Sequence, residues 1–161
     1  RVLFRSNVTL NKVKLNLSEL AVQAIVEFTP DFEKNCNEVK FTEPETPPVV
    51  FADGTKTYRI ISNLLSNAKK YSAPHTRIYA SVYKEGDYGC FEIKNISKEP
   101  LNISASELTE RFVRGDESRT NDGNGLGLSI AKDLCNLQNG KLDIIIDGDL
   151  FKVIVKLPVN E

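Results

Sequence analysis

One stretch of the chain combines three alternating glycines with an apolar segment that follows directly. It reads GNGLGLSIAK and occupies residues 123–132. Ile130, Leu134 and Leu137 keep the i, i+4, i+7 spacing of one helix face, so we expect a glycine loop that opens into an amphipathic helix. Glycine permits close backbone approach, and a helix start presents unpaired N–H groups with partial positive charge, which suits a phosphate group. A plain turn before a core helix explains this stretch equally well.

Two common phosphate loops do not fit the glycine stretch. A P-loop requires Gly-Lys-Ser/Thr at its end, whereas Gly127 is followed by Leu128. The dinucleotide-binding fingerprint requires a glycine at its sixth position after a strand, and Leu128 stands there behind a polar segment. A phosphate site at this place would therefore belong to another architecture.

Composition restricts the classes of protein to consider. The chain has 161 residues, 40% of them hydrophobic and 27% charged, with a net charge of −1. These values favour one globular domain and no nucleic-acid partner. No apolar run approaches the length of a membrane span, so we expect no membrane contact by this segment, whatever anchors its parent protein. Cys36, Cys90 and Cys135 form no CxxC pair and are expected to be buried thiols in a reducing compartment. His75 is expected to be a solvated loop residue.

Hydrophobic patterning predicts an alternating order of strands and helices. Ser18 is expected to cap the first helix, Pro30 to end or kink it, and Asp53 to cap the second helix. We expect strands at 8–15, 39–41, 49–52, 78–84, 90–94, 141–146 and 150–157, and helices at 18–28, 53–71 and after the glycine stretch. Residues 1–8 are expected to be frayed or non-native. This order predicts a two-layer α/β sandwich, in which one mixed, mostly antiparallel sheet carries three helices on one face.

A long polar connection separates the fifth predicted strand from the glycine stretch. It covers about residues 96–124 and contains only a short helical pattern at 107–112. Connections of this length inside a compact domain are usually functional. We therefore expect it to act as a lid.

The second predicted helix carries a polar stripe. Asn63, Asn67 and Lys70 stand at i, i+4 and i+7 and share one face. An Asn carbonyl oxygen is a suitable ligand for Mg²⁺, a lysine adds a charge for phosphates, and Tyr71 could stack on a base. A solvated face and an ordinary core aromatic are the alternatives. Another face of this helix is expected to pack on the sheet through Tyr58, Ile61, Leu65 and Ala68.

Three blocks of sequence resemble the ATP-binding catalytic domain of bacterial sensor histidine kinases. Residues 63–71, 111–119 and 123–128 are similar to its asparagine box, phenylalanine box and second glycine box, in order and with similar spacing. The resemblance covers about residues 9–158. It implies a Bergerat-type sandwich of the GHKL ATPase superfamily that binds Mg-ATP under a lid.

The resemblance also implies roles for individual residues. Asn67 would coordinate Mg²⁺, Lys70 would contact phosphate, Tyr71 would border the adenine, and Asn63 would support the phosphate end of ATP. Asn63, Arg114 and Arg119 would be the catalytic residues, because a guanidinium in the lid can steady a transferring phosphate. The remaining implied ATP-binding residues are Phe112, which would anchor the lid, and Gly123, Gly125, Leu126, Gly127 and Leu128. A solvated loop charge is the alternative for both arginines, and a core aromatic for Phe112.

One block departs from the family pattern. Most members have Asp-x-Gly-x-Gly after a strand, whereas this chain has Asn95, Ile96 and Ser97 there. The family aspartate accepts a hydrogen bond from the adenine amino group. Asn95 can accept one through its carbonyl oxygen, but without the charge, and Ser97 replaces a glycine. Both residues are implied in ATP binding, and both bear on nucleotide affinity and base selectivity.

The resemblance implies a reaction whose acceptor lies outside this chain. The family phosphorylates a histidine on a helical dimerisation and phosphoacceptor domain and reaches a response regulator through that domain. His75 is in the wrong place for this role, so we expect a separate acceptor domain and a cytoplasmic location in a membrane-anchored sensor. Two alternatives stay open, namely a regulatory module that only binds nucleotide, and another GHKL ATPase or anti-sigma-type serine kinase. ATPases of this group usually carry a glutamate base in the asparagine box, where Ser62 and Asn63 stand here.

Overall fold

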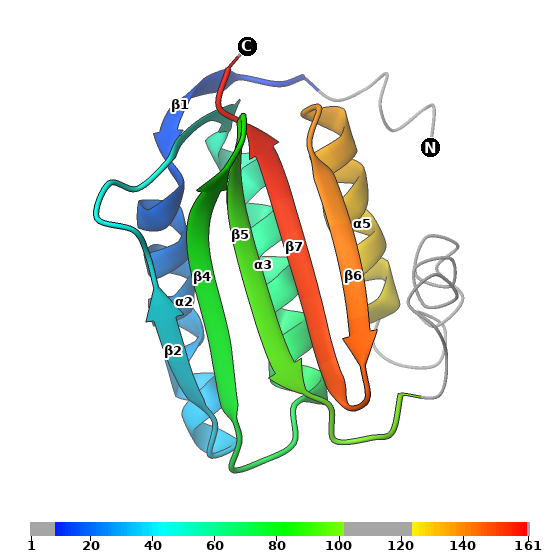
Figure 1. Cartoon of the computed structure of the whole chain (residues 1–161). Coiled ribbons are helices and arrows are strands. Elements are labelled where there is room, and N and C mark those ends of the chain that lie inside the picture. Colours follow the sequence, from blue (N-terminus) through cyan, green and yellow to red (C-terminus); the bar gives the residue numbers. More distant parts are fainter. Residues whose placement is uncertain (1–8, 102–123, 161) are drawn as a thin grey trace.

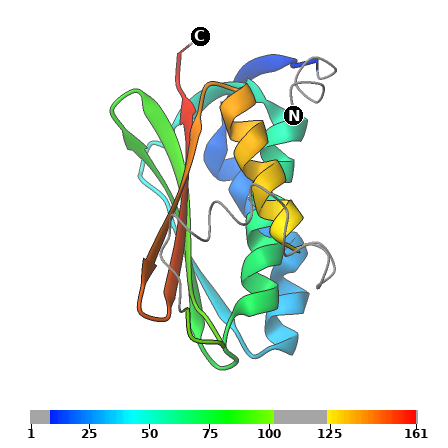
Figure 2. The same cartoon turned by 90° about the vertical axis from the view of Figure 1, so that its right-hand side faces the viewer.

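The computed structural model describes residues 9–101 and 124–160, and these form a two-layer α/β sandwich (Figure 1). A five-stranded sheet forms one layer, and three helices cover one of its faces, as the side view shows (Figure 2). In spatial order the strands are β2 (Glu38–Thr42), β4 (Arg77–Glu85), β5 (Tyr88–Ile96), β7 (Leu150–Pro158) and β6 (Lys141–Asp147). The helices are α2 (Leu17–Lys34), α3 (Gly54–Tyr71) and α5 (Asn124–Leu137). The predicted fold class is confirmed.

The sheet is mixed, and it holds fewer strands than we expected. β2 and β4 are parallel, and all other neighbours in the five-stranded sheet are antiparallel. β1 (Lys12–Asn16) and β3 (Val49–Asp53) pair with each other in a separate two-stranded sheet, so the prediction of a single sheet was wrong. β3 approaches β5 closely at Gly89, where Val50 Cγ1 of β3 lies 2.5 Å from the position that a Cβ of Gly89 would take. β3 therefore packs over β5 instead of extending an edge of the sheet.

The core lies between the sheet and the helices, and α3 is its central helix. α3 packs between α2 and α5 (Figure 1). Ile61, Leu65 and Ala68 are buried as predicted, together with Ile60. Tyr58 was expected on the sheet but is only half-buried, because its hydroxyl bonds to Glu27 of α2. The large, fully buried apolar side chains are Leu17, Phe32, Ile60, Ile61, Leu64, Leu65, Ile78, Phe91, Leu128, Leu134 and Leu157.

α2 begins at a different residue from the predicted cap, and Pro30 does not end it. Its N-cap is Asn16, whose Oδ1 accepts from the Glu19 N–H at 3.1 Å, and not Ser18, which is buried in the first turn. The Leu17 N–H donates to the Pro48 carbonyl oxygen at 3.2 Å, and this contact with a distant loop fixes where the helix starts. Pro30 lies inside the helix, which continues to Lys34. Proline has no N–H, so the carbonyl four residues earlier in the helix loses its hydrogen-bond donor. That carbonyl belongs to an exposed turn and can be hydrated instead.

α3 begins where the sequence predicted, with Asp53 as its N-cap. Asp53 Oδ1 accepts from the Lys56 N–H at 3.0 Å, and Oδ2 accepts from the Asn11 N–H at 2.8 Å. Burial alone would raise the pKa of this carboxyl, but the backbone hydrogen bonds outweigh it and hold the pKa below its ordinary value. Asp53 therefore joins the segment before β1 to the first turn of α3.

A fully buried glutamine fixes the end of α5 against the start of α3. Gln138 Oε1 accepts from the Asp53 N–H at 2.6 Å, and its Nε2 donates to the Leu134 carbonyl oxygen at 3.4 Å. The side chain has no exposed surface. A buried amide of this kind stabilises a structure only while both of its ends are bonded. Gln138 thus determines how α5 meets the junction of β3 and α3.

The cysteines match the prediction in two of three positions. Cys90 and Cys135 are buried free thiols, and burial raises the pKa of Cys90 to about 11 and raises that of Cys135 as well. Cys36 is exposed, so the expectation was wrong for it, because it lies in the turn that follows α2. His75 is an exposed turn residue, as predicted. No helix within residues 9–101 and 124–160 is both long enough and apolar enough to cross a membrane.

We predict that Gln138→Leu destabilises the fold by about 1–3 kcal/mol, because the buried Asp53 N–H would lose its acceptor. Denaturant unfolding of wild type and variant measures this difference. Gln23→Leu is the matched control, since Gln23 is exposed on α2, and it should change the free energy of unfolding by less than about 0.5 kcal/mol. Equal effects of the two substitutions would contradict the role of Gln138.

Candidate functional site

Asn63 of α3 is held by the first turn of α5. Its Nδ2 donates to the Gly127 carbonyl oxygen at 3.0 Å. Because a carbonyl oxygen can only accept, the amide nitrogen must face α5, and Oδ1 must point away from Gly127. Asn63 and Gly127, each predicted to bind ATP, are thus in direct contact, and this hydrogen bond holds the start of α5 beside α3.

Asn67, one turn further along α3, carries an unpaired buried oxygen. The residue is 5% exposed, and none of the described residues donates a hydrogen bond to its buried Oδ1. Leaving such a group unpaired costs about 1–3 kcal/mol, so native structures rarely keep one without a reason. The solvated-face alternative is therefore wrong for Asn67. A carbonyl oxygen is also the kind of ligand that Mg²⁺ accepts, and the predicted role fits this atom.

Lys70 and Tyr71 form the last turn of α3, and both are half-buried. The backbone of this end is fastened to the segment that follows β5. The Lys98 N–H donates to the Tyr71 carbonyl oxygen at 2.9 Å, and the Ala73 N–H donates to the Ile96 carbonyl oxygen at 2.8 Å. These hydrogen bonds hold the end of α3 beside the end of β5, along one side of the candidate site.

Asn95 lies at the end of β5 and carries the second unpaired amide group. It is 3% exposed, and its buried Nδ2 has no acceptor within residues 9–101 and 124–160. Along β5 it lies two residues after Ile93 and four after Phe91, which are both buried core residues, so its side chain is on the same, helix-covered face of the sheet. The side chains of Asn67 and Asn95 thus both lie between the helices and the sheet. Asn67 has an unused acceptor there, and Asn95 has an unused donor.

Ser97 is fixed by its own loop. Its N–H donates to the Asp149 carbonyl oxygen at 2.8 Å, and it forms a β-bridge with Ser72. Its hydroxyl donates to the Glu99 carbonyl oxygen at 2.7 Å. The hydroxyl therefore stabilises the turn that leaves β5, and a contact between Ser97 and a nucleotide stays a prediction.

Within the described residues, which resume at Asn124, the glycine stretch is helical and not a loop. α5 begins at Asn124, so Gly125, Leu126 and Gly127 lie in its first turn, where backbone N–H groups lack helical acceptors. Among the described residues outside the neighbouring backbone of α5, Asn63 Cγ is the atom nearest to the position of a Cβ added at Gly127, at 4.0 Å. Leu128 is 2% exposed and packs in the core. Its side chain anchors α5, and a contact between Leu128 and ATP stays a prediction.

Several predicted site residues lie outside the described part of the chain. These are Phe112, Arg114, Arg119 and Gly123, with the predicted helical segment at 107–112 and most of the expected lid at 96–124. Their roles stay predictions.

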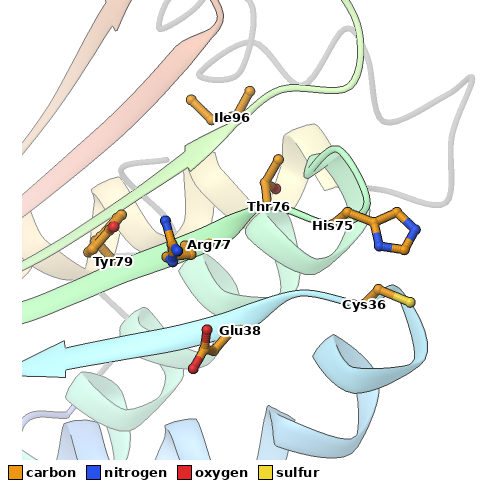
Figure 3. A pocket seen from close by; sticks show the side chains of 7 residues that line it. All are labelled: Cys36, Glu38, His75, Thr76, Arg77, Tyr79 and Ile96. Carbon is orange, nitrogen blue, oxygen red and sulfur yellow. The ribbon is translucent and has the colours of Figure 1, made fainter.

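A cavity of about 570 Å³ lies on the opposite face of the sheet (Figure 3). Its residues Glu38, Arg77 and Tyr79 alternate along their strands with buried neighbours, so they belong to the face without helices. Glu38 pairs with Lys40 at 2.9 Å, and the hydrogen bond from Lys40 holds the pKa of the Glu38 carboxyl below its ordinary value. The cavity contains none of the predicted ATP-binding residues; its lining consists of Cys36, Glu38, His75, Thr76, Arg77, Tyr79 and Ile96.

Comparisons with known proteins agree with the fold and identify the family. Residues 52–161 match the family model described as histidine kinase-, DNA gyrase B-, and HSP90-like ATPase. The sensor protein VanS of Enterococcus faecium is 32% identical over 153 residues, which cover 94% of this chain and 39% of VanS. The sensor histidine kinase HprS of Escherichia coli is 32% identical over 142 residues, which cover 86% of this chain and 31% of HprS.

Solved structures show the same architecture. The nucleotide-free catalytic domain of the histidine kinase ThkA superposes with a TM-score of 0.81 at 22% identity, covering 92% of this chain and 96% of that domain. This chain thus spans less than half of the curated relatives VanS and HprS, but almost all of the solved catalytic domain.

We predict that Asn63→Ala loosens the start of α5. Loss of the Gly127 contact should speed amide hydrogen exchange in the first turn of α5 about fivefold, which corresponds to one hydrogen bond of about 1 kcal/mol. Ser62→Ala is the control, because the Ser62 hydroxyl donates at 2.8 Å to the Tyr58 carbonyl oxygen within α3 itself. Faster exchange in both variants, or in neither, would contradict the role assigned to Asn63.

Proposed function

We propose that this chain transfers the γ-phosphoryl group of Mg-ATP to a histidine. The chain belongs to the family of histidine kinase-, DNA gyrase B- and HSP90-like ATPases. Within that family it is an ATP-binding catalytic domain of the sensor histidine kinase type. The acceptor histidine would belong to a separate dimerisation and phosphoacceptor domain. A response regulator would then take the phosphoryl group from that domain. In this proposal the domain lies in the cytoplasm, as part of a membrane-anchored sensor.

The unpaired Oδ1 of Asn67 is the observation that carries this proposal. Mg²⁺ bound there would neutralise phosphate charge, and its other ligands would be phosphate oxygens and water. The first turn of α5, which Asn63 holds in place, offers N–H groups for the same phosphates. Lys70 in the last turn of α3 adds a positive charge.

Phosphoryl transfer suits a site of this composition. The bond between the γ-phosphorus and the bridging oxygen breaks, ADP leaves, and the phosphorus bonds to an imidazole nitrogen of the acceptor. The protein mainly has to position the reactants and stabilise charge, for which amides, a lysine and backbone N–H groups are sufficient. In the proposal Arg114 and Arg119 supply further charge at the transferring group.

One feature favours a second candidate, a regulatory module that binds nucleotide without transferring phosphate. Asn95 stands where the family has an aspartate that accepts from adenine, so this chain lacks one charge-assisted hydrogen bond to the base. Both candidate functions include nucleotide binding, but only the kinase transfers a phosphoryl group.

We predict that Asn67→Ala removes the Mg²⁺ dependence of ATP binding while the domain stays folded. The reason is that the substitution deletes the only side-chain oxygen proposed as a ligand. Calorimetric titration of ATP with and without Mg²⁺ measures the difference, and thermal unfolding checks the fold. Asn136→Ala, at an exposed position of α5, is the control and should bind like wild type. An unchanged Mg²⁺ dependence in Asn67→Ala would show that the assignment is wrong.

We also predict that this chain phosphorylates the phosphoacceptor domain of its parent protein when the two are mixed with ATP. Label from a radioactive γ-phosphate should appear on the acceptor, be lost in acid and survive in base, as expected for phosphohistidine. Asn67→Ala should give no label. Saturable Mg-ATP binding without any transfer would favour the regulatory module instead.

A further inference from the structure

The cavity on the helix-free face of the sheet has a floor of strands and an end wall of two turns. Arg77 and Tyr79 of β4 and Ile96 of β5 contribute to the floor, and the turns that hold Cys36 and His75 form the end wall (Figure 3). The His75 N–H donates to the Cys36 carbonyl oxygen at 3.1 Å. This hydrogen bond ties the two turns together, so the end wall keeps its shape.

The cavity suits a small organic molecule better than a metal ion. Its volume of about 570 Å³ is typical of small-molecule sites. Cys36, Glu38 and His75 are all of a type that binds metals. Within residues 9–101 and 124–160, however, no three His, Cys, Asp or Glu side chains are grouped so as to hold a metal ion.

Arg77 supplies this cavity with a positive charge that no carboxylate of the described residues pairs with. Its neighbour across the strands is Glu38, but Glu38 forms its ion pair with Lys40, at 2.9 Å. A guanidinium binds a carboxylate or a phosphate through two parallel hydrogen bonds. Because the Glu38 carboxylate lies beside this single guanidinium, a ligand with one negative charge is favoured over a doubly charged phosphate. The charge pattern therefore points to a carboxylate.

Tyr79 and Ile96 supply apolar surface next to Arg77. They are 45% and 37% exposed, and both belong to the few large hydrophobic side chains that the described residues leave in water. The Lys94 Nζ lies 5.8 Å from the centre of the Tyr79 ring and adds a second positive charge at this place. A planar apolar group that covers Tyr79 and Ile96 would remove their surface from water, and an aromatic ring also packs well on tyrosine.

We propose that this cavity binds small aromatic carboxylates. The carboxylate accepts hydrogen bonds from the Arg77 guanidinium, and the ring packs against Tyr79 and Ile96. The inference is independent of the proposed function, because the cavity contains none of the residues proposed to bind ATP.

Titration with 2-naphthoate and its uncharged analogue 2-naphthamide, followed by backbone amide NMR shifts, tests this inference. Wild type should bind 2-naphthoate saturably, with a dissociation constant of about 1 mM or less, and the shifts should centre on residues 75–79 and 96. It should bind 2-naphthamide at least about tenfold more weakly, because the amide forms no charge-assisted pair with Arg77. The ratio of the two dissociation constants is compared within each variant, so a change in stability cancels.

Arg77→Gln should reduce the preference for 2-naphthoate to about twofold or less. Arg59→Gln is the matched control, since Arg59 is exposed on α3 and does not line the cavity, and it should keep the wild-type ratio. Tyr79→Thr should weaken both compounds about threefold or more, because both lose the ring contact. Absence of saturable binding, shifts centred on other residues, or a preference for 2-naphthoate that survives in Arg77→Gln would each overturn the inference.

The thiol of Cys36 provides a second measurement on the unaltered protein. It lines the cavity and is exposed, whereas Cys90 and Cys135 are buried. Bound 2-naphthoate should slow the alkylation of Cys36 by iodoacetamide, with half of the effect at the dissociation constant from the titration. An alkylation rate that does not change at saturating 2-naphthoate would place the compound elsewhere and overturn the inference.

Discussion

The enclosure of α3 is the constraint on which the rest of the structure depends. The sheet covers one side of this helix, and α2 and α5 cover its flanks. Polar side chains on α3 therefore cannot all reach water and need partners inside the protein or in a ligand. Asn63 finds its partner in Gly127, whereas the Asn67 oxygen finds none. Among the described residues the buried hydroxyl of Thr57 in α3 also lacks a partner, but only Asn67 lies in the polar stripe that carries the candidate site.

The position of α5 follows from amide hydrogen bonds near both of its ends. Gln138 bonds to the Asp53 N–H beyond the last turn, and Asn63 bonds to Gly127 in the first turn. Apolar side chains such as Leu128 and Leu134 provide the burial, but contacts of that kind are not directional. The amides fix the rotation and height of the helix, and thereby the place where its first N–H groups are presented. The structural role of Gln138 and the proposed functional role of the first turn of α5 therefore depend on the same placement of this helix.

Local patterns predicted the elements that local interactions determine. Alternation along β6 and β7 and the cap at Asp53 gave element bounds close to those observed, because side chains within a few residues decide them. Ser18 and Asn16 are both good caps, and a contact of Leu17 with Pro48 chose between them. The separate β1–β3 sheet depends on Val50 against Gly89, which no short window of sequence contains. The polar stripe of α3 was predictable from the spacing of its residues. The burial of Asn67 was not, because it depends on how the elements around α3 pack.

The three thiols differ in a way that has a practical consequence. Cys36 is exposed in the turn after α2, whereas Cys90 and Cys135 are buried and their raised pKa values keep them protonated. An alkylating fluorophore will therefore attach to wild-type protein at Cys36 alone. The neighbouring Asn37 donates at 2.9 Å to the Ala73 carbonyl oxygen, and Ala73 in turn bonds to Ile96 at the end of β5. The chain thus carries a natural attachment point for an optical probe, two hydrogen bonds away from the strand end that bears Asn95.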